Sequence, residues 1–183
     1  MCNAVGLKIS SKVSYMSSLD VFVIPKDISM KDLKKMINDL DIDDFTKLKV
    51  NCVLNANKTV NSLVIDTVFN IINGVKALPV MGTTIYFAVM KRNGKYQNTR
   101  AAMPPEFNDF TLNEVMDGLV ANLGKYECYH VSGEDFNDFE KIEDFNQNAN
   151  NFNEKNILIV QKEAQFPNSE LLKRLFTDPG LKF

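Results

Sequence analysis

The residues with the clearest chemical potential are a thiol and an imidazole two positions apart. Cys128 and His130, which is the chain's only histidine, flank Tyr129 in a run typical of a β-strand. Residues two apart share one face of a strand, so the pair is conceivable as a nucleophile and its general base. The rise per residue puts their Cβ atoms about 6 to 7 Å apart, too far for a direct hydrogen bond without favourable rotamers. The local sequence supplies no carboxylate that we expect to orient the imidazole, and we expect an ordinary strand.

Other patterns of reactive residues give no further chemistry. Cys2, Cys52 and Cys128 are spaced like neither a disulfide framework nor a set of zinc ligands. The glycines stand singly, without the spacing of a phosphate-binding loop. The aspartates of residues 39–44 lack the glycine and terminal glutamate of a calcium-binding loop. We therefore expect no catalytic residue, no cofactor and no metal ion.

Charge is strongly segregated along the chain, although the net charge is only −2. Residues 67–105 contain no Asp or Glu, and their cations are Lys76, Lys91, Arg92, Lys95 and Arg100. Residues 132–154 contain one lysine, Lys141, and the acids Glu134, Asp135, Asp138, Glu140, Glu143, Asp144 and Glu154. Opposite patches on one molecule favour a polyanion at the basic site or contact between neighbouring copies.

The basic region contains the strongest turn signal of the chain. Asn93-Gly94 separates two strand-like runs, and we predict a β-hairpin over about residues 84–102. A two-residue turn would set Arg92 opposite Lys95, Lys91 opposite Tyr96, and Phe87 opposite Arg100. Opposed like charges cost stability, which favours an anionic partner at the tip. Alternatively, the lysines only discourage pairing of strand edges.

This hairpin supplies our candidate residues for binding a partner or nucleic acid. Tyrosine rings beside cations could stack on the bases of a single strand. The candidates are Lys91, Arg92, Lys95, Tyr96, Arg100 and Tyr86.

The acidic region combines its charges with phenylalanines. Apolar residues recur at every third position from Phe136 to Phe145, which indicates a short helix or 3₁₀ stretch with one apolar and one acidic side. Such a segment either docks on a basic partner or covers the domain's own core. The candidate docking residues are Phe136, Phe139, Glu140, Glu143, Asp144 and Phe145.

The remaining sequence predicts an α+β fold. Period-two or continuous apolar patterns predict strands at residues 5–9, 19–24, 47–54, 83–90, 95–102, 126–131 and 157–161. Helical spacing predicts helices at residues 29–40, 111–123 and 169–176, and at 60–72, where β-branched residues keep a strand as the rival. We expect a mixed or mainly antiparallel sheet with three to four helices, because the elements alternate irregularly.

Length and composition favour one domain over residues 1–183, with residues 132–155 as an acidic, Asn-rich surface excursion. The chain has no signal-like start, and no apolar run approaches the roughly 20 residues that span a bilayer. We expect an intracellular protein with reduced cysteines and no membrane partner. The excess of Lys and Asn is typical of AT-rich coding, as in many phages and viruses.

These observations predict a non-enzymatic assembly or interaction protein, viral or phage in character, that resides in the host cytoplasm or the virion. Its partners would be copies of itself or another protein, reached through the basic and acidic patches. The alternative is a single-stranded nucleic-acid-binding protein that uses the basic hairpin.

Overall fold

The computed structural model describes residues 7–8, 12–16, 20–25, 27–40, 42–72, 82–103, 110–117 and 119–178. The described residues contain five α-helices and one mixed sheet of eight strands, which confirms the expected α+β class. The helices are α1 (Met30–Asn38), α2 (Asp44–Asn55), α3 (Ser62–Ile72), α4 (Leu112–Asp117) and α5 (Ser169–Thr177), with 3₁₀ turns η1 (Leu123–Lys125) and η2 (Ala149–Phe152). The strands are β1 (Leu7–Lys8), β2 (Lys12–Met16), β3 (Asp20–Pro25), β4 (Thr83–Met90), β5 (Tyr96–Met103), β6 (Tyr126–Ser132), β7 (Asp138–Lys141) and β8 (Asn156–Gln161).

Local capping explains where the predicted helices begin. The Ser29 hydroxyl accepts the Asp32 N–H at 3.1 Å ahead of α1. At α4, Thr111 and Glu114 bond reciprocally, each side chain accepting the other's backbone N–H. The Ser29 and Thr111 side chains each accept a backbone N–H that the first helical turn leaves unpaired. Helix α4 is shorter than predicted, because the described chain after Asp117 continues as a turn and not as a helix.

The strand predicted at residues 47–54 is wrong, because this segment forms most of α2. The Asp43 side chain accepts the Thr46 N–H at 2.7 Å and starts the helix. The buried positions are then Thr46, Val50 and Leu54, which recur every four residues. Leu48, which shares the period-two pattern, is 61% exposed. The helix cap and the row of buried residues at i, i+4 spacing thus outweigh the period-two pattern of apolar residues. The described residues therefore contain five α-helices instead of the three to four that we expected.

The sheet has the strand order β1-β2-β3-β5-β4-β8-β6-β7. Strands β3 and β5 pair in parallel, as do β4 and β8, and the other neighbours are antiparallel. The β1 strand falls within the predicted residues 5–9, of which the rest lie outside the described residues. The acidic strand β7 therefore forms one edge of the sheet, and the hairpin β4–β5 lies in its middle.

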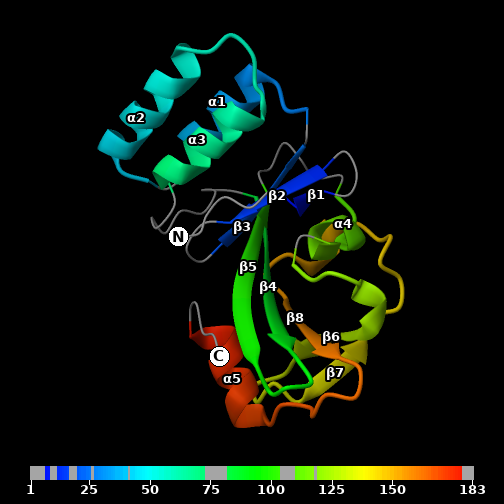
Figure 1. The fold of residues 1–183 in the computed structure, drawn as a ribbon. Coiled ribbons are helices and arrows are strands. Elements are labelled where there is room, and N and C mark those ends of the chain that lie inside the picture. Colours follow the sequence, from blue (N-terminus) through cyan, green and yellow to red (C-terminus); the bar gives the residue numbers. More distant parts are fainter. Residues whose placement is uncertain are drawn as a thin grey trace.

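Both faces of the sheet are covered (Figure 1). On one face, α5 packs through Leu172 and Leu175 against Ala88 and Leu158. On the other face, α4 and η2 close over the core that contains Phe87. A third cluster holds α1, α2 and α3 together and includes Ile24 of β3 and Ala102 of β5.

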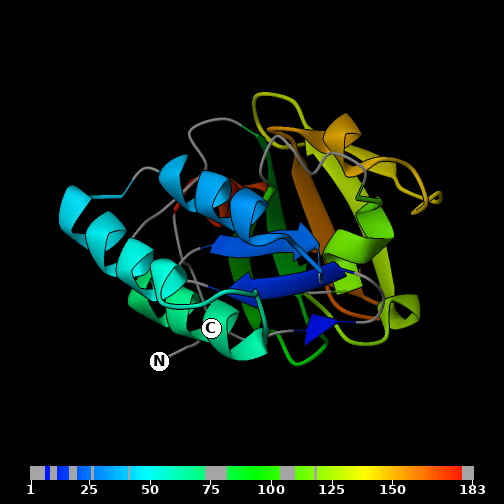
Figure 2. The same ribbon diagram turned by 90° about the horizontal axis from the view of Figure 1, so that it is seen from above.

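The helices α1, α2 and α3 lie beside one another (Figure 2), at one end of the molecule and apart from α4 and α5 (Figure 1). This helical group leaves large apolar side chains exposed, namely Phe45, Leu48 and Leu63. In the portion of the chain that the structure describes, no helix combines the length and apolar character needed to cross a bilayer.

Candidate interaction surfaces

The basic hairpin ends in a three-residue loop formed by Arg92, Asn93 and Gly94. The Lys91 N–H donates to the Lys95 carbonyl at 2.9 Å, and the Gly94 N–H donates to the Lys91 carbonyl at 3.0 Å. The Asn93 side chain accepts the Lys95 N–H at 3.0 Å. Gly94 has φ 82°, a left-handed conformation that glycine adopts without steric cost. This geometry fits a turn followed by a left-handed glycine bulge.

The three-residue loop corrects the predicted cross-strand pairs by one position. Lys91 faces Lys95, so like charges do oppose each other at the tip, but Arg92 lies in the loop. Tyr96 faces Met90, and Arg100 faces Tyr86. The two-residue turn was wrong because Gly94 serves as a bulge rather than as the second central residue of a tight turn.

Lys91, Arg92 and Lys95 form the exposed end of the hairpin, which we call the basic tip. Arg92 is anchored within the chain: its Nη1 lies 3.6 Å from Glu163 Oε2, and its N–H donates to the Gln161 side chain at 2.8 Å. Lys91 and Lys95 form no ion pair with any described residue. Their two charges therefore face solvent.

The other three hairpin candidates are not part of the basic tip. Arg100 and Tyr86 face each other across the hairpin, four residue pairs farther from the loop than the Met90–Tyr96 pair. Both side chains are half-buried. Tyr96 packs against the apolar cluster that α5 covers. Both tyrosines thus expose only part of their rings.

Two cations that sequence patterns did not single out lie near the basic tip. The Lys162 N–H donates to the Lys125 carbonyl at 2.9 Å, and both lysines are exposed. Lys162 follows Gln161, whose side chain accepts the Arg92 N–H, and Lys125 precedes Tyr126, which pairs with Gln161. Pairing of β8 with β6 brings them together, so only a prediction of strand order could have found them.

The helix predicted within the acidic segment is wrong. Residues 133–136 form a turn, and β7 pairs with β6 as the edge of the sheet. The aromatic residues lie on opposite faces: Phe136 packs with the cluster under α5, whereas Phe145 packs with the cluster under α4. The every-third spacing therefore spans a turn, a strand and a loop.

The acids of this segment are exposed on β7 and on the turn and loop that flank it, and we call this set of residues the acidic edge. Its members are Glu134, Asp135, Asp138, Glu140, Glu143 and Asp144, all exposed. Among the described residues, none of these carboxylates lies within ion-pair distance of a cation. Phe139 of β7 and Phe166 lie beside the edge, 40% and 41% exposed, with ring centroids 4.9 Å apart.

The sheet keeps the basic tip and the acidic edge apart. Strands β8 and β6 lie between β4 and β7, a separation of about 14 Å at roughly 4.8 Å per strand. Positions along the strands can be compared across β8. Met90 pairs with Val160, which pairs with Glu127 on its other side, so Met90 and Glu127 are at the same level. Tyr86 and Val131 are likewise at the same level, because both pair with Asn156. The acidic turn that follows β6 is thus at the opposite end from the tip. The sideways separation exceeds the Debye length of about 8 Å for the strand β7. The separation along the strands holds for the acidic turn alone, because Glu143 and Asp144 follow Ile142, which bonds to Cys128 at the end of β6 nearer the tip.

Cys128 and His130 share a face of β6, as predicted, and the Cys128 side chain is buried. Burial, with a smaller contribution from Glu127, raises the pKa of the Cys128 thiol to about 12. The thiol is therefore protonated at neutral pH, whereas a nucleophile needs the thiolate. Burial and the nearby Lys155 lower the pKa of His130, against a smaller opposing effect of Glu140.

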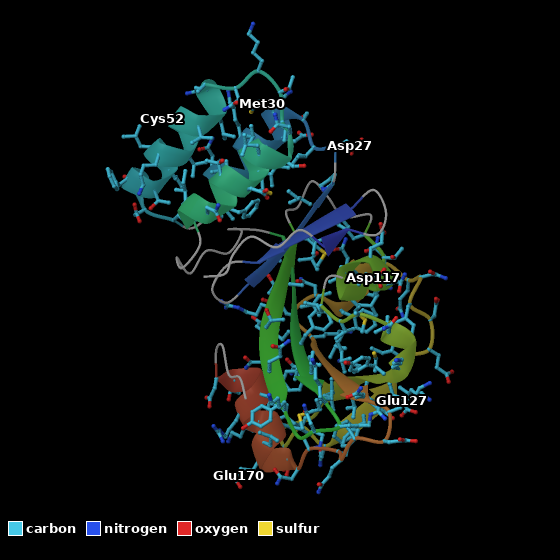
Figure 3. The ribbon with its side chains drawn as sticks, in the orientation of Figure 1. Asp27, Met30, Cys52, Asp117, Glu127 and Glu170 are labelled. Atoms are coloured by element: carbon cyan, nitrogen blue, oxygen red, sulfur yellow. The ribbon has the colours of Figure 1, made fainter. Side chains whose placement is uncertain are left out.

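Cys52 lies on α2, away from β6, where Glu127 marks the neighbourhood of Cys128 (Figure 3). It cannot complete a metal site with Cys128 and His130. Within the described ranges, no group of three His, Cys, Asp or Glu residues is arranged to hold a metal ion.

Comparison of the chain with protein-family models, with curated proteins and with solved structures finds no match.

Proposed function

We propose that this protein is a non-enzymatic assembly protein whose copies join head to tail, the basic tip of one against the acidic edge of the next. The observation that supports the proposal is that both surfaces are exposed and that no ion pair between described residues joins them. Two different complementary surfaces on one chain make a heterologous contact, which continues from copy to copy as a ring or filament.

Charge would orient the copies, and apolar burial would hold them. Exposed ion pairs contribute about 0.2–1 kcal/mol each, which is too little for a stable assembly. Phe139 and Phe166 offer partly exposed rings beside the acidic edge. The stems of Lys91 and Lys95 can cover such rings while their ammonium groups reach the carboxylates.

Two charge-reversed variants test the proposal. The tip variant carries Lys91→Glu and Lys95→Glu, and the edge variant carries Asp138→Lys and Glu140→Lys. All four side chains are exposed, so both variants should fold. Sedimentation velocity at low salt should show association of the wild-type chain and monomers for each variant alone.

Mixing the two variants is the decisive measurement. The edge variant keeps a basic tip and the tip variant keeps an acidic edge, so the mixture should form complexes that high salt dissolves. A wild-type chain that stays monomeric at every salt and protein concentration refutes self-assembly. Association that survives both charge reversals would refute the assigned surfaces.

Single-stranded nucleic acid is the alternative ligand of the basic tip. Its support is weaker, because Tyr86, Tyr96 and Arg100 are half-buried and only Tyr96 adjoins the tip. Titration with a labelled oligonucleotide at low salt should show no binding. Binding that falls steeply with salt and is lost in the tip variant would favour the alternative over the proposal.

A further inference from the structure

The outer side of β7 carries unused backbone groups. In the described part of the chain, no strand pairs with β7 beyond β6. The Ile142 N–H donates to the Cys128 carbonyl at 2.9 Å, which fixes the alternation of the antiparallel ladder. The N–H and C=O groups of Glu140 therefore point to β6, and those of Phe139 and Lys141 point outward. This edge can accept one more strand.

The two faces beside this edge differ in chemistry. Phe139 projects on the face of Tyr129, where the Phe166 ring lies 5.5 Å from Tyr129 and 4.9 Å from Phe139 in edge-to-face geometry. Asp138 and Glu140 project on the opposite face, beside His130. Lys141 projects on the same face as Phe139, so a strand added here would meet aromatic rings and one cation on that face and carboxylates on the other.

A second copy of β7 is a poor occupant of this edge. A two-fold axis between antiparallel edges keeps equivalent faces together, so residues of the same face oppose one another. The registers centred on Phe139, Glu140 or Lys141 place Asp138 opposite Glu140 of the second copy, Glu140 opposite its Glu140, or Lys141 opposite its Lys141. Like charges directly opposite destabilise a strand pair. These charges thus prevent edge-to-edge pairing of identical copies, while the acids attract a basic strand.

We propose that β7 is a strand-addition site for an extended peptide segment of a partner protein in which basic and apolar residues alternate. The peptide's backbone would bond to Phe139 and Lys141, its apolar side chains would contact Phe139 and Phe166, and its cations would contact Asp138 and Glu140. Main-chain bonds provide the affinity and alternate side chains provide the specificity. This site goes beyond head-to-tail assembly and does not depend on it.

A pair of synthetic peptides tests the site on the full-length tip variant, in which the proposed self-assembly is removed. The probe is a seven-residue peptide with lysine at odd positions and leucine or valine at even positions. Its control has the same residues with all lysines first, so its charge and composition are identical. By fluorescence anisotropy, the alternating peptide should bind about tenfold more tightly than the control.

Amide hydrogen exchange separates strand addition from charge attraction alone. Binding should slow exchange at Phe139 and Lys141, whose N–H groups point outward, and change little at Glu140, which already bonds to β6. Equal affinity for the two peptides, or unchanged exchange at Phe139 and Lys141, overturns the proposal.

Charge reversal at exposed positions provides a second check. When Asp138→Lys and Glu140→Lys are added to the tip variant, the protein should no longer bind the alternating lysine peptide. It should instead bind a version of that peptide with glutamate in place of lysine. Retention of the lysine peptide by this variant would also overturn the proposal. Because the tip variant is the starting protein, failure of self-assembly leaves these outcomes unaffected.

Discussion

The basic tip and the acidic turn both reverse the chain between antiparallel strands, but different interactions hold them. At the tip, the left-handed residue is Gly94, and an added Cβ would meet no atom within 4 Å. The acidic turn also has a left-handed glycine, Gly133 with φ 93°, but in addition Phe136 has φ 54°, and the Phe136 N–H donates to the Gly133 carbonyl at 3.2 Å. Its ring stacks on Phe176 of α5, with centroids 6.0 Å apart and planes 13° from parallel.

The difference separates local from distant control of structure. The tip is determined by four or five consecutive residues, of which Asn93 and Gly94 matter most. The acidic turn places a bulky residue in a conformation that costs about 1–3 kcal/mol, so a contact from the last helix must help to hold it. The two charged surfaces therefore depend on different parts of the chain.

The largest expected effect comes from a substitution in the buried core, on which both the tip and the acidic turn depend. Phe87 is fully buried in β4, which carries the tip and pairs with β8, the neighbour of β6. Phe87→Ala should lower the free energy of unfolding by about 3–5 kcal/mol and loosen both regions at once. Urea denaturation measures the loss. The matched control is Phe45→Ala, because Phe45 is 68% exposed and its truncation should cost less than about 1 kcal/mol.

A glycine replacement should affect the tip alone. Gly94→Ala forces a side chain into φ 82° and should cost about 1–2 kcal/mol. Gly124→Ala is the control, because Gly124 lacks a positive φ and an added Cβ there also meets open space. Thermal unfolding compares the two variants. Equal stability would show that the tip does not need its left-handed glycine.

A helix variant should affect the acidic turn and spare the tip. Phe176→Leu removes the aromatic stacking on Phe136, which is worth about 0.5–1.5 kcal/mol, while Phe176→Tyr retains it. Amide exchange in residues 133–136 should accelerate in the leucine variant only. Acceleration at residues 91–95 as well would contradict the separation of the two regions.

The smallest expected effect is a pH dependence on the acidic side. The pKa of folded His130 lies below its ordinary value of 6.5, so the unfolded chain takes up this proton first. His130 therefore contributes stability above about pH 6.5 that is lost as the pH falls towards the folded pKa. Urea titrations at several pH values should show that the free energy of unfolding falls more, as the pH is lowered, for the wild-type chain than for His130→Gln. Identical losses of stability in the two chains would exclude His130 as a cause of the pH dependence.

Sequence patterns predicted the elements whose signals are local. The helices predicted to begin at residues 29 and 111, the strands 83–90 and 157–161 and the last helix all follow from residues within one turn or one alternation. The segment 47–54 failed because its apolar residues fit periods of both two and nearly four. The adjacent Asp43 cap, which favours the helix, was the signal that could have decided it.

The candidate surfaces were less predictable than the fold. The charges of the tip and the acidic segment are read directly from the sequence, but their neighbours depend on strand order. Lys125 and Lys162 join the tip, and Phe166 joins the acidic edge, only because β8 lies between β4 and β6. The aromatic period in residues 136–145 misled because contacts with α5 and α4, far along the chain, orient those rings.

The late position of β8 in the chain affects how the molecule is made. Synthesis completes the β4–β5 and β6–β7 hairpins before residues 156–161 exist, yet β8 is the strand that joins them. During that interval each hairpin has an open apolar edge that another nascent chain can occupy. A chain truncated ahead of β8 should therefore aggregate in the cell instead of surviving as a smaller folded protein.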